Sequence, residues 1–294
     1  MSEAAKRSFD ECAIRLGYDP RSRWVGGYVD YEWSRLRVVI EAYGLQLKGK
    51  RVLEFGCNFG GSAVVMAAMG GKVDAVDIDA GAIELARLNA AQYGVDVRFQ
   101  RISPAGRLPF EAGAFDFILC NSVLEYVDLA VFPAVLAEID RVLKPGGCLL
   151  ILGTSNRLWP REIHSRRWLV NYLPKAIDRM IGRDFQRGLS PFGLRRALKG
   201  RYVDLDAADR GQAWLRARAA FHGSARASAA ARAACIAALL MGVGPGWLAP
   251  NMSVLLRRRP EQTPEDTHRL IAERTARILP PAKAHSHSRP ARLS

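Results

Sequence analysis

The segment RVLEFGCNFGGSAVVMA, residues 51–67, constrains the fold more than any other stretch of the chain. Its first residues form a short apolar run that predicts a buried strand, and the small and apolar residues after the turn predict a helix. Between them, Gly56, Gly60 and Gly61 allow positive φ angles and close approach of the backbone. Because the first N–H groups of a helix have no partner inside the helix, such a turn is suited to binding a ligand.

Helix-like and strand-like segments alternate from residue 28 to residue 154. Apolar residues at helical spacing predict helices, and short apolar runs bounded by glycine or polar residues predict strands. The predicted helices are 28–45, 62–69, 80–94 and 129–143, and the predicted strands are 51–56, 72–79, 97–100, 115–121 and 148–154. Strands joined by helices of this length form a parallel sheet covered on both faces, which binds its ligand at the carboxyl ends of the strands.

The pattern changes after residue 154. Residues 156–174 are dense in arginine, tryptophan and proline, and the segments that follow predict a helix and a strand within 190–206, a helix at about 211–241 and a last strand at 251–258. The composition from residue 260 on predicts a short helix at 264–278 and a disordered end. The expected fold is therefore an α/β, doubly wound, mostly parallel seven-stranded sheet with an Arg-rich helical insertion after the fifth strand.

The net charge of +14 is unevenly distributed. Residues 161–232 carry 16 basic and 6 acidic side chains, and residues 257–294 carry 9 and 4, whereas residues 1–160 are close to neutral. The Arg-rich segment 156–232, called the basic lobe below, suits an acidic substrate, an anionic membrane surface or nucleic acid. A solvated surface without a partner explains the same composition, and these alternatives stay open.

The distribution of apolar residues and cysteines along the chain predicts the cellular compartment of the protein. The chain has no run of about 18 apolar residues that could span a membrane, and its N-terminus lacks the apolar core of a signal peptide. The five cysteines are scattered and show no CxxC spacing. We therefore expect a cytoplasmic protein with reduced thiols and no zinc site.

Asn58 stands where a dinucleotide-binding loop has its second glycine, and this position bears on the choice of cofactor. An asparagine side chain there would crowd the phosphates of NAD, whereas S-adenosylmethionine has no phosphates. Asparagine also tolerates the left-handed backbone better than other non-glycine residues. Asp77 ends the second predicted strand, where a carboxylate can accept hydrogen bonds from both ribose hydroxyls. The loop therefore favours S-adenosylmethionine over NAD.

Five motifs in order give the chain a wider resemblance. They are VLEFGC-x-x-G at 52–60, VD at 76–77, LPF…FD at 108–116, NSVLE at 121–125 and LKPGG at 143–147. With them the chain resembles the class I S-adenosylmethionine-dependent methyltransferases over about residues 28–154, and two later segments fit the family's last two strands. The resemblance implies four segments: an N-terminal helical cap at 1–48, a cofactor-binding core at 49–154, a basic substrate-side insertion with the last two strands at 155–258, and a basic, largely disordered tail at 259–294.

The resemblance implies roles for residues on the methionine side of the cofactor. Glu54 would orient the loop or receive the methionine ammonium, directly or through water. Gly56, Asn58 and Gly60 would line the methionine and the ribose. Asn121 would offer its side-chain amide or its backbone carbonyl near the methionine.

The adenosine side of the cofactor is implied in the same way. Asp77 would hold the ribose hydroxyls, and Ile78 would pack on the adenine. The acidic residue that often accepts the adenine amino group is missing from residues 101–110. Ser103 or a backbone carbonyl is expected to replace it.

His164 is the candidate general base. Methyl transfer is an in-line displacement in which the enzyme mainly aligns the reactants, and an oxygen or nitrogen nucleophile can need a base whose pKa is near neutral. Of the five histidines, only His164 directly follows the predicted core. If the segment is extended, Glu162 points the same way and orients the imidazole. The alternative is that both residues brace the insertion through hydrogen bonds. No third ligand supports a metal site.

The resulting functional hypothesis is methyl transfer to a small-molecule or lipid/glycan-like acceptor, at oxygen, with peripheral membrane contact through the basic lobe as a further possibility. An NAD-dependent oxidoreductase and a non-catalytic protein that binds nucleic acid or a membrane surface are the alternatives. The sequence NSVLEY stands where nucleobase and amide-nitrogen methyltransferases carry DPPY or NPPY, which disfavours a nucleic-acid substrate. The sequence leaves the acceptor and the oligomeric state open.

Overall fold

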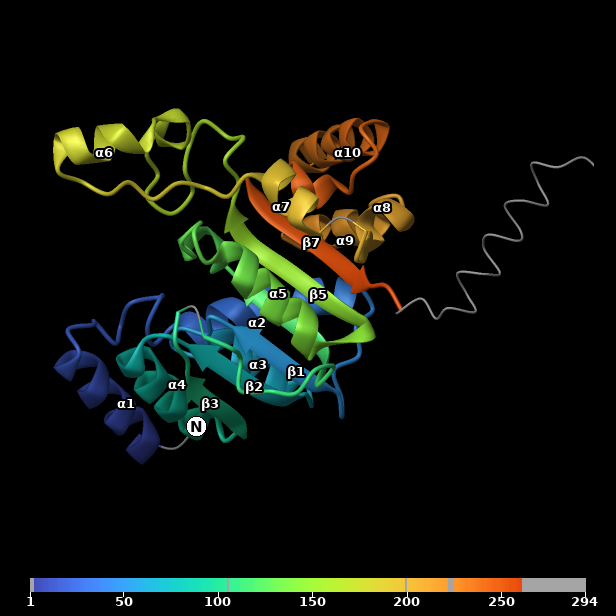
Figure 1. Ribbon diagram of the computed structural model, residues 1–294. Coiled ribbons are helices and arrows are strands. Elements are labelled where there is room, and N and C mark those ends of the chain that lie inside the picture. Colours follow the sequence, from blue (N-terminus) through green and yellow to red (C-terminus); the bar gives the residue numbers. More distant parts are fainter. Residues whose placement is uncertain (1–2, 105, 199, 222–224, 261–294) are drawn as a thin grey trace, which may run out of the picture. The chain divides into compact units, whose positions relative to one another are not determined.

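The computed structural model describes residues 3–104, 106–198, 200–221 and 225–260, without the side chains of residues 225–227. These residues contain a seven-stranded sheet in the order β3-β2-β1-β4-β5-β7-β6 (Figure 1). The strands are β1 Arg51–Phe55, β2 Lys72–Asp77, β3 Val97–Arg101, β4 Phe115–Asn121, β5 Leu143–Ser155, β6 Tyr202–Asp204 and β7 Asn251–Arg258. Strands β1 to β5 are parallel, and β7 is antiparallel to both β5 and β6. The predicted mostly parallel seven-stranded sheet is confirmed.

Helices cover both faces of this sheet (Figure 1). Residues of α2, α3, α4 and α9 pack in one apolar cluster, and residues of α5, α7 and α10 pack in another. Helix α1 packs against α4. The helices are α1 Glu3–Arg15, α2 Tyr28–Ala42, α3 Gly61–Ala68, α4 Ala80–Tyr93, α5 Phe132–Val142, α6 Lys175–Ile181, α7 Pro191–Leu198, α8 Leu205–Ala208, α9 Gln212–Phe221 and α10 Ala225–Leu240, with the 3-10 turns η1 Leu124–Tyr126, η2 Val170–Tyr172 and η3 Pro245–Trp247.

The alternation of side chains along each strand decides which residues face α2. In β1, Val52 packs in the cluster of α2 and α3, so Glu54, two residues on, faces the same side. In β4, Leu119 belongs to the same cluster, so Asn121 also faces α2. The parallel order of β1 and β4 then brings these two polar side chains to one end of the sheet.

Two elements differ from the predictions. The helix expected over 211–241 is divided, because α9 ends at Phe221 and α10 begins at Ala225. Strand β5 begins at Leu143, so it includes the KPGG segment that was expected to precede it. The helix at 264–278 and the disordered tail fall outside the described residues. Residues 1–259 form one unit, so the four predicted segments remain a proposed division by role.

Asp206, at the start of α8, is a buried carboxyl in this unit. Burial, together with the charges of Asp204 and Asp209, raises the pKa of Asp206 to about 8. A carboxyl with this pKa keeps its proton in the folded protein near pH 7. Its contribution to stability therefore depends on pH, as developed in the Discussion.

Candidate active site

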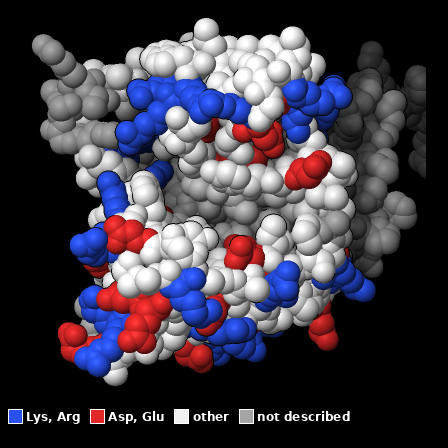
Figure 2. Space-filling model, turned by 90° about the vertical axis from the view of Figure 1, so that its left-hand side faces the viewer, with Lys and Arg blue, Asp and Glu red and all other residues white. Residues whose placement is uncertain are grey.

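A cleft of about 790 Å³ lies at the carboxyl ends of β1, β2 and β4. Its walls come from the glycine-rich loop, from α2, from the loop after β4 and from the segment after β5. Figure 2 views the molecule from the side to which the parallel strands of Figure 1 point, and shows a hollow below a part of the surface where Lys and Arg gather. This is the end of the sheet at which the sequence predicts ligand binding.

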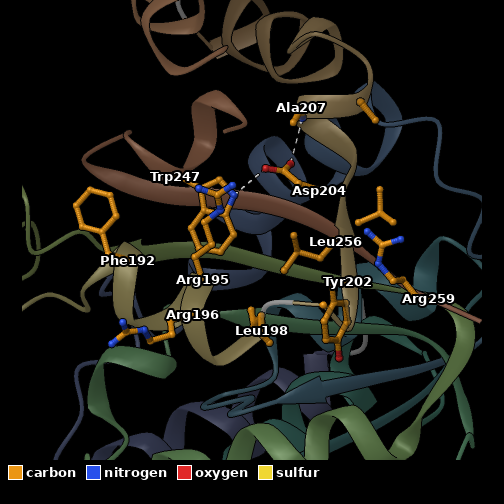
Figure 3. A pocket seen from close by; sticks show the side chains of 13 residues that line it. Phe192, Arg195, Arg196, Leu198, Tyr202, Asp204, Ala207, Trp247, Leu256 and Arg259 are labelled. Carbon is orange, nitrogen blue, oxygen red and sulfur yellow. Dashed lines mark hydrogen bonds between the residues drawn. The ribbon is translucent and has the colours of Figure 1, made fainter. Parts of the chain in front are cut away.

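A larger hollow of about 900 Å³ lies at the edge strand β6 (Figure 3). Its carboxylate, Asp204, accepts hydrogen bonds from the backbone N–H groups of Ala207 and Gly244 (3.1 and 2.9 Å). It also accepts one from Nε1 of Trp247 at 2.9 Å. These bonds satisfy Asp204 and brace the turn after β6, and no residue predicted from the sequence lines this hollow. We therefore place the functional site in the smaller cleft.

The glycine-rich loop has the backbone that its sequence requires. Gly56 has φ = 76°, and a Cβ there would lie 2.1 Å from Cγ2 of Val123, so only glycine fits. Asn58 has φ = 47°, in the left-handed region that asparagine tolerates. Gly60 caps the N-terminus of α3 with φ = 74°. Gly56 and Asn58 line the cleft and Gly60 does not, and the contacts of all three with a cofactor stay predictions.

Asp77 is fixed at the end of β2 by two backbone donors. Its Oδ2 accepts a hydrogen bond from the N–H of Asn58 at 2.8 Å, and its Oδ1 accepts one from the N–H of Asp79 at 3.0 Å. Each carboxylate oxygen can accept more than one hydrogen bond. Asp77 therefore joins the loop to β2 and still offers acceptor sites to the cleft that it lines.

Two buried carboxyl groups lie in this region: Glu32 lines the cleft, and Glu54 stands near the carboxyl end of β1 and does not line it. Burial and the charge of Glu32 raise the pKa of Glu54 well above its ordinary value, although hydrogen bonds from Ser62 and from the backbone of Ala63 act against this. Burial likewise raises the pKa of Glu32 on α2, against the effects of Arg35 and Asn121. The Oε2 atoms of both glutamates are buried and have no hydrogen-bond partner among the described residues.

Asn121 connects these groups to the end of β4. Its Nδ2 donates to Oε1 of Glu32 at 3.1 Å and to Oγ of Ser62 at 3.0 Å. The side-chain amide therefore orders the buried carboxyl of Glu32, and Asn121 itself lines the cleft. The position agrees with the predicted one, while its role toward a cofactor stays a prediction.

His164 reaches the cleft from the segment after β5 and is held by a buried carboxylate. Its Nε2 lies 2.8 Å from Oε1 of Glu125, whose side chain is fully buried, while 30% of the His164 side chain is exposed. The same Oε1 accepts the backbone N–H of Ser155 at 3.0 Å, which ties the pair to β5. Burial lowers the pKa of His164, but the hydrogen bond and charge of Glu125 and the charge of Glu162 outweigh it, so the pKa lies above its ordinary value.

Glu162 does not orient the imidazole, contrary to the expected pairing. Its carboxylate accepts hydrogen bonds from the backbone N–H groups of His164 (3.1 Å) and Ser165 (2.5 Å). The segment turns at residues 163–165 instead of running extended, and His164 lines the cleft whereas Glu162 does not. Burial raises the pKa of Glu162, but these backbone amides outweigh it and the pKa falls below its ordinary value. Glu162 thus braces the turn that carries His164.

Two predicted adenine-side residues do not line the cleft. Ile78 follows β2 and is 50% exposed. Ser103 is also exposed, and its carbonyl accepts the N–H of Gly106 in a turn. Contacts of Ile78 and Ser103 with adenine therefore stay predictions.

Sequence reasoning missed Glu32 and Glu125. Glu32 lies on the buried face of α2 between Val29 and Leu36, where the helical pattern predicts an apolar residue. A carboxylate at such a position could have been recognised from the sequence as a candidate functional residue. Glu125 belongs to the NSVLE motif but pairs with a residue 39 positions away, which no local pattern predicts. Among the described residues, no group of three or more His, Cys, Asp or Glu side chains could hold a metal ion.

Comparison with known proteins agrees with this geometry. A family profile described as "Methyltransferase domain" matches residues 52–147, which include the loop, Asp77, Asn121 and Glu125. Residues 52–147 of this chain are therefore similar to methyltransferase domains. This match agrees with the expected methyl donor, S-adenosylmethionine, and not with NAD.

Relatives of this chain include two named as ubiquinone biosynthesis O-methyltransferases. The one from Nitrosococcus oceani is 36% identical over 151 residues, which cover 50% of this chain and 61% of the relative. The one from Thiobacillus denitrificans is 28% identical over 197 residues, which cover 66% and 79%. A solved S-adenosylmethionine-dependent methyltransferase from Aquifex aeolicus matches 57% of this chain and 82% of its own with 19% identity and a TM-score of 0.43.

The groups in and beside the cleft are suited to S-adenosylmethionine. The partnerless buried oxygens of Glu32 and Glu54 suit the methionine ammonium group, because an unpaired buried acceptor calls for a donor. Asp77 lines the cleft and offers acceptors for ribose hydroxyls. We expect Glu32, Glu54 and Asp77 to hold the cofactor.

Proposed function

We propose that the protein transfers a methyl group from S-adenosylmethionine to an oxygen of a small-molecule or lipid/glycan-like acceptor. The observation that carries the proposal is that one cleft contains both the methyltransferase loop and His164, held by the buried Glu125. The named function of the relatives, O-methylation in ubiquinone biosynthesis, supports transfer to oxygen.

His164 acts as the general base in this proposal. S-adenosylmethionine supplies an electrophilic methyl group on a sulfonium centre, and the protein aligns the acceptor oxygen and excludes water. Glu125 engages Nε2 of His164, and none of the described residues makes a hydrogen bond to Nδ1. The acceptor hydroxyl would give its proton to Nδ1 while its oxygen takes the methyl group; the bond between that methyl group and sulfur would break, and S-adenosylhomocysteine would leave as a neutral thioether. Glu125 would stabilise the imidazolium that forms. Glu162 serves as a positioning residue through the turn beneath the imidazole.

The raised pKa of His164 gives the proposal a pH signature. A general base works in its neutral form, so the rate rises with pH through the pKa of the imidazole. Because Glu125 and Glu162 stabilise the protonated ring, this rise lies above the ordinary value of 6.5. Activity is then lost below that pH although the fold is intact.

We also propose that the basic lobe touches an anionic membrane surface. Between β5 and α7 this lobe exposes Trp168 (65%), Met180 (84%) and Ile181 (55%), and the basic side chains exposed beside them are Arg161, Arg166, Arg167, Lys175, Arg179 and Arg183. Exposed apolar groups next to cations are typical of interfacial binding. None of the described helices is long and apolar enough to cross a membrane. The five cysteines, all unpaired, favour the cytoplasm as the compartment.

The experiment is a transfer assay with S-adenosylmethionine labelled in its methyl group and fractionated lipid and small-molecule extracts as acceptors. We expect label in one acceptor class with the wild type and at least a tenfold loss in His164→Ala, since a positioned base contributes about 10²-fold or more. Titration with S-adenosylhomocysteine should show that His164→Ala still binds cofactor. Unchanged transfer by His164→Ala would remove His164 as the base. Salt-sensitive RNA binding without cofactor binding would favour the non-catalytic alternative.

Membrane contact has its own test. Wild type should sediment with vesicles that contain phosphatidylglycerol and not with pure phosphatidylcholine vesicles, and Trp168→Ala with Met180→Asp should abolish sedimentation. Equal sedimentation of this double variant and the wild type would overturn the membrane proposal.

A further inference from the structure

A second chamber of about 410 Å³ adjoins the cofactor cleft. Both cavities are lined by Tyr31, Arg35 and Asn251, so they meet at these residues. The chamber lies between α2, α9 and the face of the sheet formed by β5 and β7. The residues proposed above to hold the cofactor and to act as the base do not line this chamber.

Two helical stripes and the sheet build the chamber. On α2, the residues at spacing i, i+4 and i+8 are Tyr31, Arg35 and Val39, and on α9 the stripe at i, i+3, i+4 and i+7 consists of Trp214, Ala217, Arg218 and Phe221. Residues at these spacings share one face of a helix. Both stripes therefore point inward, and each places an arginine among apolar and aromatic side chains.

Three arginines, Arg23, Arg35 and Arg218, line this chamber without an acidic partner. Among the described residues, no carboxylate lies within 4.0 Å of their guanidinium groups. By contrast, the buried Arg187 is held by Asp178 at 2.6 Å. A cation taken out of water normally has such a partner. Arg35 and Arg218 are half-buried and Arg23 is exposed, so among these described residues the chamber carries positive charge without a direct ion pair. The charge of Glu32 acts on Arg35 from farther away.

Aromatic rings orient these guanidinium groups. Arg218 lies 4.9 Å from the ring centre of Trp214, and Arg23 lies 4.4 Å from that of Tyr31. A guanidinium stacked on a ring keeps its N–H edge free, and that planar edge matches a carboxylate or a phosphate. Burial and the like charge of Arg35 lower the pKa of Arg218, which agrees with a cation that lacks a counterion.

We propose that the chamber binds an anionic group, a carboxylate or a phosphate, of an acceptor with an aromatic or apolar body. This rests on the proposed function, since the anion is taken to belong to the methyl acceptor. The charges of the two cavities differ: Glu32 and Asp77 line the cleft, Arg23 and Arg218 line the chamber, and Arg35 lines both where they meet. The acceptor is held by its anion in the chamber, and its hydroxyl reaches the cleft through the opening at Tyr31, Arg35 and Asn251.

The test is calorimetric titration with phenyl phosphate, benzoate and the neutral control benzyl alcohol. It is run on the protein alone and on the protein saturated with S-adenosylhomocysteine. We expect at least one anion to bind, benzyl alcohol not to bind, and Arg218→Met to weaken anion binding about tenfold or more, the effect of a lost charged hydrogen bond. Arg216→Met is the matched control: Arg216 lies exposed on the same helix, hydrogen-bonded to the carbonyl of Ala42, and its loss should leave binding unchanged.

A second readout separates a binding role from a structural one. Without anion, Arg218→Met should raise Tm, because methionine removes a half-buried cation that has no ion-pair partner among the described residues, while it keeps the packing. Added phenyl phosphate or benzoate should raise Tm of the wild type and not of Arg218→Met. No anion binding to folded protein, or equal weakening in Arg218→Met and Arg216→Met, would overturn the proposal. Failure of the protein to bind S-adenosylhomocysteine would instead contradict the proposed function. The titration of the protein without S-adenosylhomocysteine would still test anion binding in the chamber.

Discussion

Replacement of Asp77 by alanine tests the cofactor cleft where its geometry is best defined. The carboxylate accepts the backbone N–H of Asn58 at 2.8 Å and that of Asp79 at 3.0 Å. In the proposed complex it also accepts the two ribose hydroxyls. Asp77→Ala therefore removes the ribose acceptors and leaves the loop N–H of Asn58 without its partner.

The expected loss follows from the strength of charged hydrogen bonds. A hydrogen bond to a charged group contributes about 1.5–3 kcal/mol. Water replaces part of each of the two lost bonds, so we expect a net loss of about 3 kcal/mol, which is roughly 100-fold in Kd. The effect should appear in the affinity for S-adenosylhomocysteine, which needs no knowledge of the acceptor.

Asp79→Ala is the matched control, two residues along the chain. Asp79 caps α4 by accepting the N–H of Ala82 at 2.8 Å. Its loss should lower the free energy of unfolding by about 1 kcal/mol, the usual contribution of such a cap, while Kd changes by less than about threefold.

Calorimetric titration of both variants, with Tm measured to confirm folding, decides the question. If folded Asp77→Ala bound S-adenosylhomocysteine within a few-fold of the wild type, or if Asp79→Ala lost as much affinity, the reasoning about Asp77 would be refuted.

Three other predictions follow from particular side chains. Glu125→Gln should lower the pKa of His164 in an NMR titration, because the charge that stabilises the imidazolium is removed; an unchanged pKa would contradict the pairing. Asp206, with its pKa raised to about 8 from 3.8, keeps its proton on folding, so its contribution to stability falls as the pH rises between these values. Asp206→Asn should therefore gain stability over the wild type from pH 5 to pH 8.5, by up to roughly 5 kcal/mol, and urea unfolding that shows no such gain contradicts the assignment. Gly56→Ala should destabilise more than Gly94→Ala, by at least about 1 kcal/mol, because both have positive φ but only Gly56 meets a neighbouring side chain within 4 Å; equal losses would show that overlap is unimportant.

The local pattern of apolar, glycine and polar residues predicted most of the sheet and the glycine-rich loop. The loop conformation is encoded by adjacent residues, so the left-handed backbone of Asn58 and the position of Asp77 at the end of β2 could be anticipated. The carboxyl ends of parallel strands meet at one edge, so Asn121 could be placed beside the loop before its contacts were known.

What escaped prediction depends on packing between distant segments. Glu162 was paired with His164 because an extended segment was assumed, whereas the backbone turns there and Glu125 from the loop after β4 takes that place. The chamber required α9 to lie against α2, which the single helix expected over 211–241 did not suggest. Such contacts arise from tertiary packing, which periodicity along one segment cannot report.

A crystal structure of the protein with S-adenosylhomocysteine would show directly whether the cleft at the carboxyl ends of the strands binds the cofactor. We expect the ligand in the cleft of about 790 Å³, with its ammonium group at Glu54 and Glu32. Its ribose hydroxyls should donate to Asp77, and its sulfur should face His164. Ligand bound in the hollow at β6, or bound in the cleft with its ribose away from Asp77, would contradict this expectation.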